Sequence, residues 1–168
     1  MKIITAISAV LSALLLCACG ASGSDITPYT KGITFTADIT LYNECCSAEV
    51  SVSKDGETRF ELISPENVEG LTLIFSGSEV HAEFDELEYP YSISPLDESG
   101  MCGRLYAILA DTFDPETKAT AEADLIYVSG RTQDAEYRLY LGATGLPISA
   151  ESANGSFTAV FKNVTVTP

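Results

Sequence analysis

The chain alternates apolar and polar residues over long stretches, and this pattern constrains its fold more than any other feature. Residues 33–41 alternate without a break, and residues 48–52 resume the alternation after a short loop. A period of two places successive side chains on opposite faces of a β-strand, so both segments are predicted to be strands with one buried face. Residues 54–57, Lys-Asp-Gly-Glu, predict a two-residue type I′ hairpin into a third strand that carries Phe60 and Leu62.

The remaining strand-like segments are separated by glycine and proline residues, which interrupt regular structure. They cover residues 71–75, 79–84, 121–128, 136–141 and 157–166, with a short additional segment at 148–150.

One segment has a helical period instead. Cys102, Leu105 and Leu109 fall near one face of a helix predicted within residues 99–113. The helix is expected to end before Pro115, because the residue that precedes a proline disfavours helical geometry. The predicted fold class is therefore mainly β (α+β), with an antiparallel sheet of about eight to eleven strands and at least one helix.

The N-terminus has the pattern of an export signal. Lys2 precedes an apolar run at residues 3–16, which is shorter than the about 20 residues that a transmembrane helix needs. The run closes with the residues Leu-Cys-Ala-Cys-Gly at positions 16–20, which resemble the lipobox of bacterial lipoproteins. That resemblance implies cleavage before Cys19 and acylation of its thiol. Ordinary secretion, with cleavage after Ala21 or Gly23, is the alternative.

These features divide the chain into a signal peptide at residues 1–18, a lipidated N-terminus and flexible tether at residues 19–30, and one β domain at residues 31–168. The expected location is the outer face of the bacterial cell membrane, held by lipid. Beyond the signal, eight basic residues face 24 acidic ones, for a net charge of −16. Such a charge disfavours binding to nucleic acid or to an anionic membrane face, so the acyl group would provide the membrane attachment.

Three cysteines remain beyond Cys19: Cys45, Cys46 and Cys102. An exported location permits a disulfide, and an odd number leaves one thiol unpaired or free to link two chains. Cys102 with either Cys45 or Cys46 is the natural pairing, because a bond between neighbouring cysteines strains the peptide. The alternative is that all three are reduced and buried as small apolar residues.

The order of elements is similar to that of the LolA-like lipoprotein carrier superfamily, which includes LolB-like and LppX-like lipoproteins. The resemblance rests on the first hairpin at 54–56, the stretch 64–71, the helix at 105–113, the stretch 137–148 and the last strand at 157–164. It implies a curved half-barrel wrapped around one to three helices, with an apolar interior that binds acyl chains or other hydrophobic ligands. An interaction scaffold of the envelope or spore, with the same fold and no cavity, is the alternative function.

The residues that would line such an interior occupy the inward phases of the predicted strands and helix; a filled core would show the same pattern. They are Ile33, Phe35, Ile39, Val50, Val52, Phe60, Leu62, Leu73, Phe75, Phe84, Leu105 and Leu109.

The sequence predicts no enzyme, cofactor or metal site. His81 is the only histidine and has no nucleophile motif nearby. The acidic residues at 83–88 do not have the spacing of a calcium loop, and the glycines lie in turns rather than in a phosphate-binding loop. The expected partners are the membrane, through the N-terminal lipid, a lipid or lipoprotein ligand, and a protein of the envelope.

Overall fold

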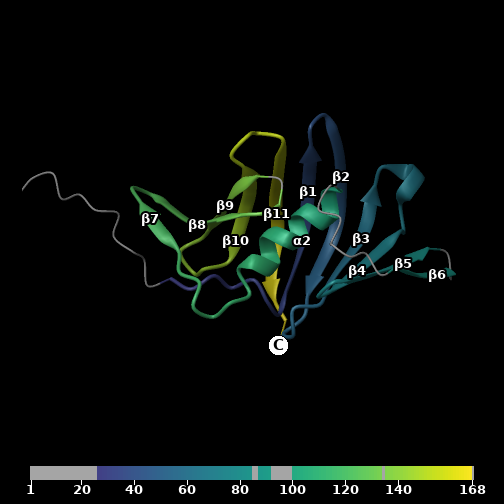
Figure 1. The fold of residues 1–168 in the computed structure, drawn as a ribbon, viewed down its shortest axis with the longest axis horizontal. Helices are drawn as coiled ribbons and strands as arrows, with labels where there is room; N and C mark the ends of the chain where they lie inside the picture. Colours follow the sequence, from purple (N-terminus) through teal and green to yellow (C-terminus); the bar gives the residue numbers. More distant parts are fainter. Residues whose placement is uncertain (1–25, 85–86, 92–99, 134, 168) are drawn as a thin grey trace, which may run out of the picture.

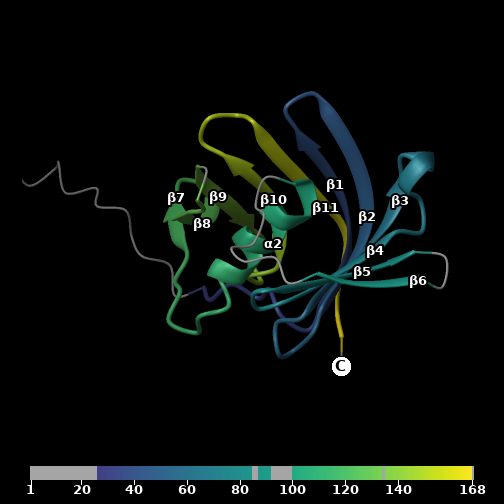
Figure 2. The same cartoon turned by 45° about the vertical axis from the view of Figure 1, so that its right-hand side comes forward.

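A computed structural model describes residues 26–84, 87–91, 100–133 and 135–167. Within this part of the chain, one antiparallel sheet of 11 strands curves around a single α-helix, α2 (Met101–Asp111), as Figures 1 and 2 show. The predicted mainly β half-barrel is therefore confirmed. The predicted signal peptide and Cys19 lie outside the described residues. No helix among the described residues is long and apolar enough to cross a membrane.

The strands follow one another in two meanders that meet in the middle of the sheet. Their order is β6-β5-β4-β3-β2-β1-β11-β10-β9-β8-β7, and α2 comes between the two edge strands in the sequence. A short 3₁₀ helix, η1 (Glu66–Val68), follows β3. The strands are β1 (Ile33–Leu41), β2 (Glu44–Val52), β3 (Thr58–Ser64), β4 (Thr72–Ser76), β5 (Glu79–Phe84), β6 (Leu87–Tyr91), β7 (Thr120–Glu122), β8 (Leu125–Arg131), β9 (Glu136–Leu141), β10 (Pro147–Ser152) and β11 (Phe157–Val166).

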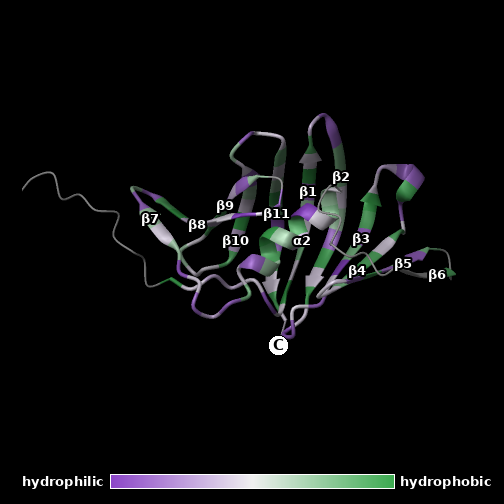
Figure 3. Cartoon of the chain, in the orientation of Figure 1, coloured by the Kyte–Doolittle hydropathy of each residue, from purple (hydrophilic) through white to green (hydrophobic). Residues whose placement is uncertain are grey.

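The alternating pattern of β1 and its neighbours produces the buried face of the sheet. β1 pairs with β2 along its whole length, and its other edge pairs with β11, so Leu41 lies opposite Phe157. Inward side chains of these central strands meet α2, and the rings of Phe35 and Phe161 pack with centroids 4.9 Å apart. Figure 3 shows the resulting alternation of hydrophobic and hydrophilic residues along the central strands. The core thus lies between the concave face of the sheet and the helix.

Two local predictions are corrected by the backbone. Residues 121–128 are not one strand: β7 and β8 form a hairpin that turns at Ala123, whose φ of 52° lies in the left-handed region. The hairpin at residues 54–57 exists, but its turn is not the two-residue type I′. Only Gly56 has a positive φ there, and the N–H of Ser53 donates to Glu57 O at 2.8 Å. This is the three-residue loop that ends in a left-handed glycine.

Candidate apolar binding site

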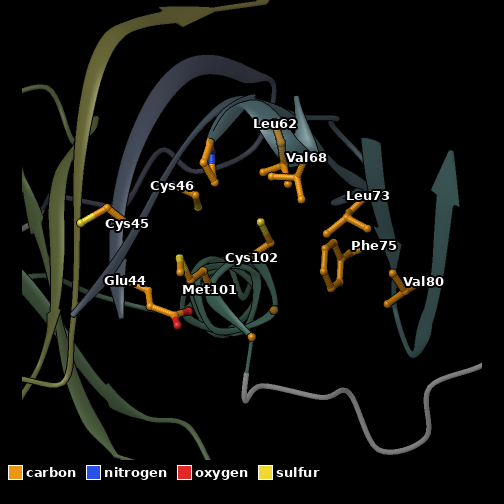
Figure 4. Close-up of a pocket in the computed structure, with 13 residues that line it drawn as sticks. Glu44, Cys45, Cys46, Leu62, Val68, Leu73, Phe75, Val80, Met101 and Cys102 are labelled. Carbon is orange, nitrogen blue, oxygen red and sulfur yellow. The ribbon is translucent and has the colours of Figure 1, made fainter. Parts of the chain in front are cut away.

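An apolar cavity of about 650 Å³ lies between the first turn of α2 and the strands of the N-terminal meander. Figure 4 shows its walls, which come from the beginning of β2, the end of β3, η1, β4, β5 and α2. The volume falls within the range of small-molecule sites in proteins. The lining residues are Glu44, Cys45, Cys46, Leu62, Pro65, Val68, Leu73, Phe75, Val80, Gly100, Met101, Cys102 and Gly103.

Apart from Met101, the residues at the start of α2 that line the cavity are small. Gly100, Cys102 and Gly103 all line it, and a Cβ added at Gly100 would meet no atom within 4 Å. One turn further along the helix, Leu105 and Tyr106 are large and buried. The helix therefore fills the space under the sheet along most of its length and leaves it open at its N-terminal end.

Aromatic packing closes one side of the cavity. The ring of Phe75 stacks on Tyr106 at 4.9 Å and meets Phe60 edge-on at 5.4 Å. The Tyr106 hydroxyl donates to the carbonyl of Gly77 at 3.4 Å, while burial raises the pKa of the phenol. A phenol is uncharged at neutral pH even at its usual pKa, and the raised pKa extends this state to higher pH. The wall therefore offers an apolar aromatic surface to anything in the cavity.

Glu44 is the one charged residue among those that line the cavity. Its side chain lies near Met101 at the first turn of the helix (Figure 4), and the residue is exposed to solvent. The guanidinium of Arg104, by contrast, donates to the hydroxyl of Ser156 at 3.2 Å, and Arg104 does not line the cavity. The cavity thus has an apolar wall and one carboxylate.

The structure separates the three cysteines. Cys46 faces inward from β2 and Cys102 faces it from α2, both buried, whereas the thiol of exposed Cys45 points away from the cavity (Figure 4). A hydrogen bond from the Cys102 thiol lowers the pKa of Cys46. The same bond and burial raise the pKa of Cys102. All three thiols are free, so the structure brings together one of the predicted disulfide pairs without bonding it.

The predicted lining residues divide into three groups. Leu62, Leu73 and Phe75 line the cavity. Eight lie in the packed core and do not line it: Ile33, Phe35, Ile39, Val50, Val52, Phe60, Leu105 and Leu109. Phe84 continues the inward phase of Val80 along β5, yet 43% of it is exposed. The prediction that Phe84 lines the interior is corrected, because the packed core does not extend to the end of this strand.

Sequence reasoning missed the lining residues outside the regular alternation. Pro65 and Val68 belong to the segment around η1, which interrupts the strands, and Gly100 and Gly103 carry no apolar side chain. The run of small residues at the start of the predicted helix was the available signal. A helix that begins with small residues leaves space against whatever packs beside it.

The acidic and histidine side chains form no site in the part of the chain that the structure describes. No group of three or more His, Cys, Asp or Glu residues is arranged to hold a metal ion among these residues. The His81 side chain is 47% exposed and lies 4.0 Å from the carboxylate of Glu79.

Two solved structures are similar to this fold. An uncharacterized conserved protein from Thermus thermophilus has 16% sequence identity and a TM-score of 0.49, over 82% of this chain and 80% of that one. A LolA superfamily protein from Nitrosomonas europaea has 8% identity and a TM-score of 0.45, over 86% of this chain and 90% of that one. No family model matches the sequence, and a search of curated proteins finds no match. The class that the described fold and site define is an open β half-barrel with an apolar cavity beside its helix.

Proposed function

We propose that this protein is a non-enzymatic, LolA-like lipoprotein that binds or transfers a hydrophobic ligand, such as a lipid or an acyl chain, in the cavity beside α2. The observation that carries the proposal is a 650 Å³ space whose walls are almost entirely apolar. The lipobox resemblance supports an acyl anchor at Cys19 and a location on the outer face of the cell membrane. The predicted tether would hold the cavity near the bilayer, although its last residues belong to the domain: the Tyr29 N–H donates to Gly145 O at 2.8 Å, and the buried Thr30 hydroxyl contacts that of Thr112 at 2.9 Å.

Burial of apolar surface would provide the binding energy. Each methylene group that leaves water contributes about 0.8 kcal/mol, so an alkyl chain needs no polar partner inside the cavity. The ring of Phe75 would form an aromatic wall beside the alkyl chain. It stacks on Tyr106, with 4.9 Å between the two ring centroids. The carboxylate of Glu44 would meet only the polar end of a ligand, at the solvent-exposed side.

A dodecyl amide of dansyl is a suitable probe, because its chain is uncharged and its fluorescence rises in an apolar site. Residues 20–168 contain the whole described fold and omit the signal and Cys19. We expect saturable binding of the probe by this chain, and a loss of at least about tenfold in affinity when Leu73→Trp fills the cavity.

Ile74→Trp is the matched control, because Ile74 is the next residue of β4, is equally half-buried and does not line the cavity. It should leave probe affinity unchanged. If the unaltered chain does not bind the probe, the ligand-binding proposal is wrong. A stoichiometric protein partner in that case would favour the interaction scaffold.

A further inference from the structure

Two thiols from distant parts of the sequence meet in the wall of the cavity. Cys46 comes from β2 and Cys102 from the first turn of α2, and their exposed fractions are 8% and 6%. Figure 4 shows the two side chains turned toward each other between β2 and the helix. Their neighbour Cys45 lies on the opposite face of β2, where its sulfur contacts the Thr40 hydroxyl at 3.5 Å. The fold therefore brings Cys46 and Cys102 together and keeps Cys45 apart from them.

We propose that Cys46 and Cys102 form a disulfide site that regulates the cavity: the oxidised pair draws the first turn of α2 toward β2 and weakens the binding of an alkyl chain. The effect on binding rests on the proposed function. The formation of the bond does not.

The reaction is an exchange with an external disulfide, such as a small-molecule disulfide or that of a thiol oxidoreductase. The Cys46 thiolate attacks one sulfur of that disulfide, forms a mixed disulfide and releases one thiolate. Cys102 then loses its proton, attacks the Cys46 sulfur and displaces the second thiolate. The protein gives up two protons and two electrons, and the external disulfide becomes two thiols.

The surroundings suit this order of attack. Both residues line the cavity, so a reagent can approach them through it although little of either is exposed. The lowered pKa of Cys46 makes it the better thiolate. Cys46 and burial raise the pKa of Cys102, so Cys102 does not attack first. Once Cys46 is in the mixed disulfide it no longer holds the proton on Cys102, which can then ionise and attack the neighbouring sulfur.

Geometry sets the direction of the effect on binding. A disulfide holds its sulfur atoms at about 2.05 Å, closer than the sulfur atoms of two free thiols can lie. The first turn of α2 must follow Cys102, and no side chain caps this end of the helix at Gly100. The same turn supplies Gly100, Met101 and Gly103 to the cavity, so its movement toward β2 narrows the space. Conversely, an alkyl chain bound in the cavity should shield both sulfur atoms from the external disulfide.

The test treats residues 20–168 with oxidised glutathione and maps the disulfides by mass spectrometry. We expect a Cys46–Cys102 bond in the unaltered chain and in Cys45→Ser, and no intrachain bond in Cys46→Ser or Cys102→Ser. Oxidation should weaken binding of the dansyl dodecyl amide by about fivefold or more in the first two proteins and leave it unchanged in the last two. The probe should also slow the oxidation.

Two results would overturn the inference. A bond from Cys102 to Cys45, or no intrachain bond in folded protein, would refute the site. A Cys46–Cys102 bond that leaves probe affinity unchanged would refute the regulation. If reduced protein does not bind the probe at all, the proposed function fails, and the mapping still decides whether the disulfide site exists. Circular dichroism of both single variants shows whether they retain the fold.

Discussion

The two ends of α2 face the same curved sheet with opposite results. Toward its C-terminal end, Leu105, Ile108 and Leu109 are completely or almost completely buried among side chains of the central and C-terminal strands, a packed region we call the closed end. At its first turn, small residues leave the 650 Å³ cavity against the N-terminal strands, which we call the open end. Both ends face strands with inward apolar side chains. The two ends therefore differ in the volume of the helix side chains and not in the pattern of the strands. Large helix side chains give a packed core, and small ones leave a cavity.

The largest expected effect comes from the same truncation, leucine to alanine, at the closed end and at the open end. Leu109→Ala should lower the free energy of unfolding by about 2–5 kcal/mol, because Leu109 is fully buried and its loss creates a new void. Leu73→Ala should cost less than about 2 kcal/mol, because this side chain is half-buried and already borders empty space. Urea unfolding at one pH measures both. Equal losses would show that the open end is packed like the closed end.

A second test concerns a polar contact of the closed end. The Tyr137 hydroxyl donates to the carboxylate of Asp111 at 2.5 Å, and Tyr137 is 2% exposed. Tyr137→Phe should lower the free energy of unfolding at neutral pH by about 1.5–3 kcal/mol, because a buried hydrogen bond to a charged group is lost.

The same contact predicts the pH dependence of stability. Burial and the Asp111 carboxylate raise the pKa of Tyr137 above its usual value of 10.0. Above about pH 10 the unfolded chain loses this proton while the folded chain retains it, so stability falls as pH rises. Urea unfolding between pH 8 and pH 11 should show a shallower decline for Tyr137→Phe than for the unaltered protein. Tyr42→Phe is the control, since Tyr42 is 71% exposed and should leave the pH dependence unaltered.

The smallest effect concerns the single charge of the open end. Glu44 should favour a cationic over an anionic chain end, so the protein is expected to bind dodecylammonium more tightly than dodecanoate. A carboxylate at contact distance in water contributes about 1 kcal/mol, or about fivefold in affinity. Glu44→Gln should reduce this preference, measured by displacement of the dansyl probe. Glu69→Gln, an exposed carboxylate that does not line the cavity, should leave the preference unchanged.

The local sequence pattern predicted the secondary structure well where one face of a strand is exposed to solvent. The strand at residues 33–41 and the helix that contains Cys102 and Leu105 are present in the structure. The alternation failed at residues 121–128, where a two-residue turn interrupts an otherwise strand-like run. Ala123 adopts a left-handed backbone without the glycine that usually indicates one, and Asp124 was the only turn-favouring residue between the two strands.

The sequence contained more information on the cysteines than the prediction used, which left Cys45 and Cys46 equal as neighbours of Cys102. The inward phase of Ala48, Val50 and Val52 extends back by two residues to Cys46, which places Cys45 on the outer face. Cys102 shares a helix face with Leu105. Together these two phases favour Cys46 as the neighbour of Cys102, and in the fold the two side chains face each other in the wall of the cavity (Figure 4). Only the relative position of β2 and α2 could supply that contact.

By itself, the sequence determined most of the strands, the helix and the apolar face that each turns inward, because these depend on the spacing of neighbouring residues. It did not determine β6 or the hairpin of β7 and β8. Tertiary structure decided which apolar residues pack together and which border a cavity. Eight of the predicted lining residues are core, and Phe84 is exposed, although all of them occupy inward phases. Packing and space depend on the summed volumes of side chains brought together from β2, β4 and α2, and no local pattern contains that sum.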